Sequence, residues 1–99
     1  MPQITVEYSE SLSEAFDRRA LALALHHAAA ELIHSAIPGF KTRFRAIDEG
    51  VIASGGSGEA MIHVELAILP GRDEETRTRL GELTLATLHD HLRPAGTNT

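Results

Sequence analysis

The stretch ALALALHHAAAELI, residues 20–33, decides the fold, because it can be read either as a strand or as a helix. Leu21, Leu23 and Leu25 alternate with alanine, which is the period-two pattern of a strand. Alanine, however, is the best helix former and is depleted in strands. A helical stripe also runs through the segment, made of Leu21, Leu25, Ala28 and Leu32. The sequence therefore predicts a helix here.

The flanking residues suggest where this helix begins and ends. Ser11 followed three residues later by Glu14 fits a capping box, so we expect the helix to run from Glu14 to about Ser35. Pro38 and Gly39 then stop it.

Strands are predicted on both sides of the helix. Residues 3–8 and 40–47 alternate between apolar and polar side chains, as half-buried strands do. A strand, a long helix and a second strand form a βαβ unit, in which the two strands lie parallel.

The second half of the chain repeats the order of strand and helix. We expect a loop at 53–60, a strand at 61–69 and a helix from about Glu74 to Leu92 with Asp73 as its N-cap. QITVE at 3–7 and MIHVE at 61–65 share the pattern I-x-V-E, which suggests two copies of a β-α unit. These elements predict an α/β (α+β) fold: a mixed sheet against two helices in one domain, 1–99, with a core at about 2–92 and a polar tail at 93–99.

Composition limits the function. The 99 residues include no cysteine, which excludes disulfides and a thiolate site. We expect no membrane segment and no signal peptide, hence a cytoplasmic protein, because the chain has neither a long apolar run nor a basic start followed by an apolar one. The net charge of −5 and the four aromatic residues argue against a nucleic-acid partner.

Three cations stand at alternate positions of the second predicted strand. Lys41, Arg43 and Arg45 therefore project from one face, and an anion among them would offset their mutual repulsion. The alternative is a solvated face whose charges are balanced by nearby carboxylates. Arg72, in a PGRD turn, is a further candidate, although it can equally be a turn residue paired with Asp73 or Glu75.

Pro2 is a candidate base. Removal of Met1 would leave a secondary amine at the end of a rigid strand, and burial and nearby cations both favour the neutral, basic form of an amine. The alternative is a proline that simply begins a strand, where its missing N–H costs nothing.

The six histidines do not predict a metal site. No two of them have the i, i+4 spacing of a helical zinc site, and no dinucleotide-binding or P-loop motif is present. We therefore expect neither a metal nor a cofactor.

Four motifs together resemble the tautomerase superfamily, and within it the 5-carboxymethyl-2-hydroxymuconate Δ-isomerases. They are Pro2, the VEYS at 6–9, the G-x-[KR]-x-R pattern at 39–43, and the strand–Gly–Arg–helix segment around Arg72. The resemblance covers roughly residues 2–92. It implies a four-stranded sheet backed by two helices, a homotrimer, and a cofactor-free proton shift in a small unsaturated keto or enol acid with two or three carboxylates.

The resemblance also implies roles for individual residues. Pro2 matches the base, while Lys41, Arg43 and Arg72 match cations that bind the anionic substrate. Arg45 has no counterpart, so its role rests on strand alternation alone. Two departures matter: Lys41 replaces an arginine, which loses the bidentate fork, and the polar tail cannot supply the strand that follows the second helix in longer members.

Two alternatives to this isomerase remain open. A relative could use the same proline on a different substrate, as a phenylpyruvate-type tautomerase or a haloacid hydratase. A non-catalytic trimeric module that only binds anions would also keep the cations, and retention of Met1 would favour it.

Overall fold

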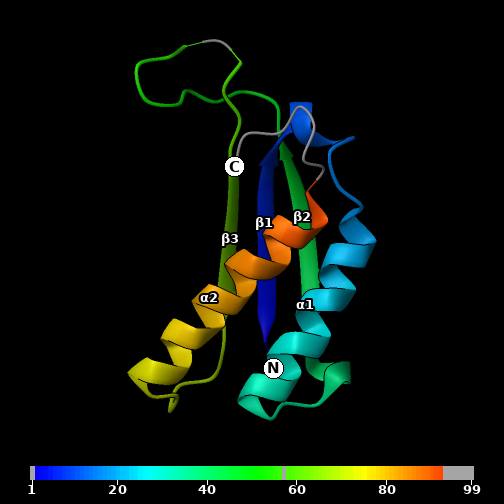
Figure 1. Ribbon diagram of the computed structural model, residues 1–99, viewed down its shortest axis with the longest axis vertical. Coiled ribbons are helices and arrows are strands. Elements are labelled where there is room, and N and C mark those ends of the chain that lie inside the picture. The colour runs from blue at the N-terminus through cyan, green and yellow to red at the C-terminus, as the bar shows by residue number, and fades with distance from the viewer. Residues whose placement is uncertain (1, 57, 93–99) are drawn as a thin grey trace.

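The computed structural model describes residues 2–56 and 58–92, so the predicted polar tail lies outside the described residues. Its elements follow the order β1 (Gln3–Ser9), η1 (Glu10–Leu12), α1 (Arg18–Ile33), η2 (Ile37–Gly39), β2 (Lys41–Ile47), β3 (Ile62–Ala67) and α2 (Glu74–His91). The two α-helices lie side by side on one face of the sheet (Figure 1). Among the described residues the sheet has three strands in the order β2-β1-β3.

The mixed sheet confirms the predicted topology. β1 and β2 run parallel, with Gln3 opposite Lys41, whereas β1 and β3 run antiparallel, with Val6 opposite Val64. Val6 and Val64 are also equivalent positions of the I-x-V-E repeat, so the two copies of the motif cross at this pair. The two strands that carry the motif are therefore related by a local two-fold arrangement within the sheet.

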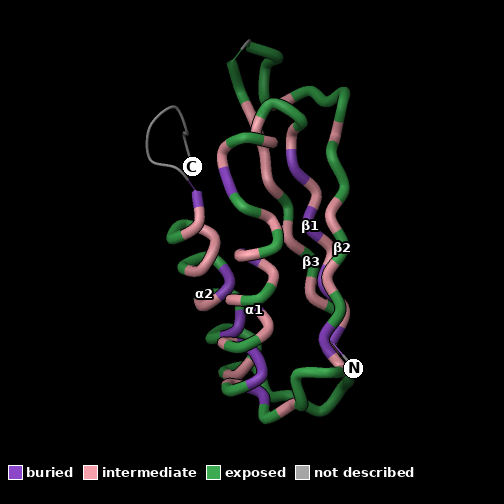
Figure 2. Tube along the Cα trace, turned by 90° about the vertical axis from the view of Figure 1, so that its right-hand side faces the viewer, coloured by how far each residue is buried: buried purple, intermediate pink, exposed green. Residues whose placement is uncertain are grey.

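The core lies between the sheet and the helices (Figure 2). The largest fully buried side chains come from both layers: Ile4, Val6, Leu21 and Leu25. Ile4, Val6 and Tyr8 alternate with half-buried residues along β1, which is the two-residue period of a strand with one face covered. Leu21 and Leu25 lie on one face of α1, so the helical reading of residues 20–33 is confirmed.

The start of α1 differs from the prediction. The helix begins at Arg18, and the side chain of Asp17 caps it by accepting a hydrogen bond from Ala20 N at 3.0 Å. Residues 10–12 form a short 3₁₀ turn instead, so the proposed capping box of Ser11 and Glu14 is wrong. The reason is Phe16, which is only 6% exposed.

Phe16 holds the preceding segment out of the helix. Its ring meets Tyr8 edge-on, with 5.5 Å between ring centroids, and lies 6.5 Å from the ring of Phe44. Its backbone also forms an isolated antiparallel bridge with Leu92, just after α2. Burial of this ring in the shared core therefore moves the helix start four residues along the chain.

The second helix begins where the sequence predicts. Asp73 caps α2 by accepting a hydrogen bond from Thr76 N at 2.8 Å. Glu74 and Glu75 follow in the first turn, where their negative charges interact favourably with the helix dipole and stabilise the helix. None of the helices in the described part of the chain is long and apolar enough to cross a membrane.

Candidate active site at the amino-terminal end of the sheet

Pro2 lies at the end of the sheet where three segments meet. It precedes β1, and its carbonyl oxygen accepts a hydrogen bond from the backbone N–H of Lys41 at 3.2 Å. Because β3 is antiparallel to β1, its last residue, Ala67, lies opposite Gln3 at the same end. Pro2 itself is buried. The starts of β1 and β2 and the end of β3 thus lie at the same end of the sheet, next to Pro2 (Figure 1).

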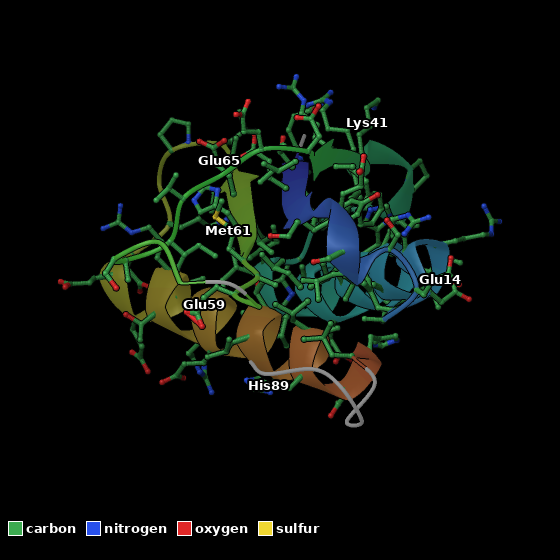
Figure 3. The ribbon with its side chains drawn as sticks, turned by 90° about the horizontal axis from the view of Figure 1, so that it is seen from above. Glu14, Lys41, Glu59, Met61, Glu65 and His89 are labelled. Atoms are coloured by element: carbon green, nitrogen blue, oxygen red, sulfur yellow. The ribbon has the colours of Figure 1, made fainter. Side chains whose placement is uncertain are left out.

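The predicted cations lie on the open face of β2. Lys41, Arg43 and Arg45 are exposed, whereas Thr42 and Phe44 between them are half-buried toward the helices. Seen along the strands, Lys41 and Glu65 lie on the side of the sheet away from the helices (Figure 3). The alternation predicted for this strand is therefore confirmed, and the three cations share one face.

The three cations differ in their neighbours. Gln3 lies opposite Lys41 in the register of β1 and β2, and Glu7 lies opposite Arg45. Glu7 Oε1 is also 3.8 Å from His63 Nδ1 on β3. Arg45 thus has a carboxylate-bearing residue directly across from it, while Lys41 and Arg43 are nearer to Pro2.

Arg43 makes a contact that the sequence did not predict. Its Nη2–H donates a hydrogen bond to Gln3 Oε1, with 3.0 Å between the two heavy atoms. Gln3 occupies the same open face as the cations, but the pairing depends on strand register. No pattern in the sequence fixes that register.

Arg72 lies in the exposed segment that joins β3 to α2. Gly71 before it adopts a φ of 108°, which favours glycine, and Asp73 after it caps α2. This segment leaves β3 at the end of the sheet that carries Pro2 (Figure 1). Arg72 is therefore near the same end, on a different element from the other cations.

His26 makes contacts that the sequence did not predict, because the sequence considered it only as a possible metal ligand. Its Nε2 lies 2.7 Å from Thr42 Oγ1, and its ring lies 5.4 Å from that of Phe40. Burial lowers the pKa of His26, and the neighbouring His27 lowers it further. A neutral imidazole thus joins α1 to the helix-facing side of β2.

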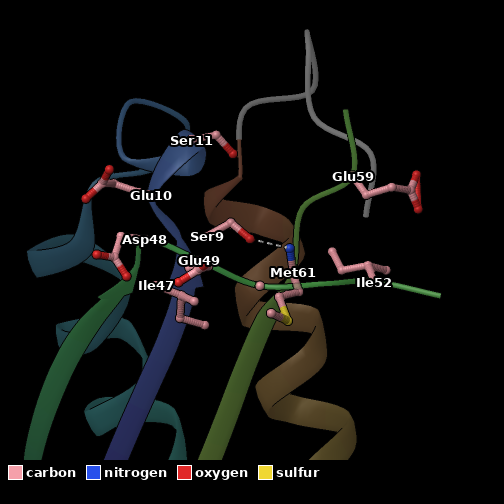
Figure 4. Close-up of a pocket in the computed structure, with 10 residues that line it drawn as sticks. Ser9, Glu10, Ser11, Ile47, Asp48, Glu49, Ile52, Glu59 and Met61 are labelled. Atoms are coloured by element: carbon pink, nitrogen blue, oxygen red, sulfur yellow. Dashed lines mark hydrogen bonds between the residues drawn. The ribbon is translucent and has the colours of Figure 1, made fainter. Parts of the chain in front are cut away.

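A hollow of about 410 Å³ lies at the other end of the sheet. It is lined by the ends of β1 and β2, by η1 and by the loop before β3 (Figure 4). Within this lining, Ser9 Oγ accepts a hydrogen bond from Met61 N at 2.9 Å. Four carboxylates line it: Glu10, Asp48, Glu49 and Glu59. This charge repels an anion, so the hollow does not suit an anionic substrate.

The described residues contain no group of three or more histidine or acidic side chains arranged to hold a metal ion. At this end of the sheet the structure places a buried proline, Pro2, with cationic side chains on neighbouring segments. Such side chains bind carboxylates and stabilise oxyanions.

Comparison with known proteins identifies the family to which the chain belongs. Residues 2–99 match the sequence profile of the family described as 5-carboxymethyl-2-hydroxymuconate isomerase. The chain belongs to this family. A comparison with curated protein sequences gives no match.

Several solved structures share the fold. A 5-carboxymethyl-2-hydroxymuconate isomerase from Deinococcus radiodurans R1 is 29% identical and has a TM-score of 0.78; the alignment covers 91% of this chain and 68% of that chain. A 5-carboxymethyl-2-hydroxymuconate delta-isomerase is 22% identical over 92% of this chain and 70% of that one, with a TM-score of 0.80. The family and these folds support an isomerase or tautomerase enzyme.

A third structure of the same fold is a fused 4-OT described as a symmetric trimer. It is 22% identical, with a TM-score of 0.77, over 95% of this chain and 76% of that chain. The predicted tautomerase-like fold is therefore confirmed.

Proposed function

We propose that this protein is a cofactor-independent isomerase that shifts a proton within small unsaturated keto or enol acids carrying two or three carboxylates. Pro2, freed by removal of Met1, is the general base. Its neutral amine takes a proton from a carbon next to a conjugated carbonyl, and the electron pair moves onto the carbonyl oxygen. The prolinium then returns the proton at another carbon of the conjugated chain.

The cations have two roles in this proposal. Lys41, Arg43 and Arg72 bind the carboxylates of the substrate and stabilise the negative charge that develops on its oxygen. Arg45 is a fourth candidate for carboxylate binding, farther from Pro2 along β2. The observation that carries the proposal is the hydrogen bond from Lys41 N to Pro2 O, which joins the start of the cationic strand to the proline.

We also propose that three copies of the chain form the working enzyme. The face of the sheet opposite the helices carries Lys41, Arg43 and Arg45, and no described element covers it (Figure 2). β2 and β3 are both edge strands of the described sheet, so each leaves backbone groups available to a neighbour. The fused 4-OT of the same fold is a symmetric trimer, which supports this assembly.

Replacement of Pro2 by alanine tests the base. Alanine keeps a free amine after Met1 is removed, but the amine is primary and is no longer held in a ring. With 5-carboxymethyl-2-hydroxymuconate as substrate, we expect kcat to fall roughly a hundredfold, within the range for loss of a positioned base. Mass spectrometry of both proteins confirms that Met1 is absent, and light scattering reports the number of subunits.

The substrate panel separates the proposal from its alternatives. Phenylenolpyruvate and a 3-haloacrylate, tested beside the dicarboxylic dienol, report tautomerase and hydratase activity. A higher kcat/KM with phenylenolpyruvate or with the haloacrylate than with the dienol would assign the protein to tautomerase or hydratase activity instead. An unchanged kcat in Pro2→Ala would rule out Pro2 as the base, and a retained Met1 in the natural protein would leave only anion binding.

A further inference from the structure

The side chain of Arg43 leans toward the proline end of the sheet. In the parallel register Arg43 lies opposite Thr5, yet its Nη2 bonds to Gln3, two residues nearer Pro2. Two residues of a strand span about 6.6 Å. The guanidinium is therefore drawn away from its register partner and toward the start of β1.

Gln3 is chemically suited to hold an arginine without neutralising it. Its amide oxygen is a neutral acceptor and occupies one of the five N–H donors of the guanidinium. The positive charge and the other donors stay available for an anion. A carboxylate at the same place would hold the arginine equally well but would cancel its charge, so it would compete with an anionic substrate.

Gln3 is also fixed relative to the proline. It follows Pro2 directly in the chain, and its own position is set by the ladder that pairs it with Lys41 on one side and Ala67 on the other. The backbone bond from Lys41 N to Pro2 O lies immediately beside it. The hydrogen bond from Arg43 to the Gln3 side chain therefore fixes the guanidinium relative to the start of β1.

We propose that Gln3 is a positioning residue that holds the Arg43 guanidinium toward Pro2 for carboxylate binding. This inference rests on the proposed function, because it assigns Arg43 to the anionic substrate. It adds a residue outside the set of cations and proline, and it predicts that a neutral acceptor at position 3 raises the affinity for carboxylates.

The test measures binding of trans,trans-muconate by isothermal titration calorimetry. This dicarboxylate has no enol hydroxyl and does not undergo the proton shift, so binding is read without turnover. Gln3→Leu removes the acceptor, and Gln3→Glu keeps an acceptor but adds negative charge. Thr5→Val is the matched control, because Thr5 faces Arg43 in the register but takes no part in the hydrogen bond.

The expected pattern has a definite order. Gln3→Leu raises the Kd for muconate by roughly three- to tenfold, as loss of one typical side-chain hydrogen bond does, because the bond between Gln3 and Arg43 is exposed to solvent. Gln3→Glu raises it further, by more than about tenfold, because its carboxylate neutralises the guanidinium. Thr5→Val changes it by less than about twofold, and in an Arg43→Leu background Gln3→Leu has no further effect.

Three results would overturn the proposal. Equal losses from Gln3→Leu with and without Arg43 would show that Gln3 acts elsewhere. A Kd for Gln3→Glu equal to wild type would show that charge at this position is irrelevant, and a wild type that binds no muconate would remove the role of Arg43. Circular dichroism and thermal melting of each variant show whether it is folded.

Failure of the proposed function would look different. If Pro2→Ala keeps full activity while muconate binding still depends on Gln3 through Arg43, the catalytic role of the proline fails and the positioning role stands. If Pro2→Ala loses activity and Gln3→Leu changes neither the Kd nor the KM, the opposite conclusion follows.

Discussion

The backbone N–H of Lys41 donates a hydrogen bond to the carbonyl oxygen of Pro2, with 3.2 Å between the two atoms. This bond sets the distances at which the other cations of β2 stand from the proline. Arg43 begins about 6.6 Å farther along the strand and Arg45 about 13 Å farther, before side-chain reach is counted. The three cations should therefore contribute unequally.

Arg43→Leu and Arg45→Leu make this inequality measurable. We expect Arg43→Leu to lower kcat/KM by roughly a hundredfold, comparable to loss of one group that stabilises an oxyanion. Arg45→Leu should lower it by less than about tenfold, because Arg45 is farther from Pro2 and faces Glu7 across the strands. Steady-state kinetics on the dicarboxylic dienol measure both; similar losses would place the substrate farther along β2 than we propose.

Insertion of a serine between Met1 and Pro2 should abolish the proton shift while preserving anion binding. Processing then leaves serine joined to Pro2, so the proline nitrogen becomes an amide without a basic lone pair. We expect kcat to fall by about 10²- to 10⁴-fold, the usual contribution of a positioned base. Calorimetry with muconate should still detect binding, and appreciable turnover by this variant would show that another group is the base.

The helix caps give a prediction about stability. Asp17→Ala should lower the free energy of unfolding by about 1 kcal/mol, because Asp17 accepts a hydrogen bond from Ala20 N at the start of α1. Ser11→Ala should change it by less than about 0.5 kcal/mol, because Ser11 lies in the 3₁₀ turn before the helix. Urea unfolding of both variants measures the difference. A larger loss of unfolding free energy from Ser11→Ala than from Asp17→Ala would show that Ser11 caps the helix.

The buried imidazole predicts a dependence of stability on pH. Burial, and then the neighbouring His27, lower the pKa of His26 below its ordinary value of 6.5. As the pH falls below about 7, the unfolded chain therefore binds this proton before the folded chain does, and the free energy of unfolding decreases. The decrease levels off once the pH is below the pKa of the folded state.

His26→Gln should flatten this part of the stability curve. Urea unfolding at intervals from about pH 7.5 to about pH 5 gives the slope for each protein. His34→Gln is the control, because His34 is exposed at the end of α1 and should leave the slope as in wild type. The same slope in His26→Gln and wild type would show that another group controls this range.

Much of the fold follows from local patterns. Alternation in residues 3–8 and 40–47, alanine-rich helical spacing in 20–33, and Asp73 before an acidic turn each predict an element that the structure contains. Such patterns act over a few residues, where backbone propensity and capping decide the conformation. The predicted start of α1 was wrong for a non-local reason. Phe16 is buried against Tyr8 and Phe44, and no local rule includes those contacts.

The candidate site divides in the same way. The two-residue period of a strand places Lys41, Arg43 and Arg45 on one face whatever surrounds them, so the sequence by itself determined that these charges lie together on β2. Only the tertiary structure decided that Pro2 lies beside Lys41 and that Arg43 turns to Gln3. Those contacts join residues about forty positions apart, and their geometry depends on strand register, which is set by hydrogen bonds and core packing across the whole sheet.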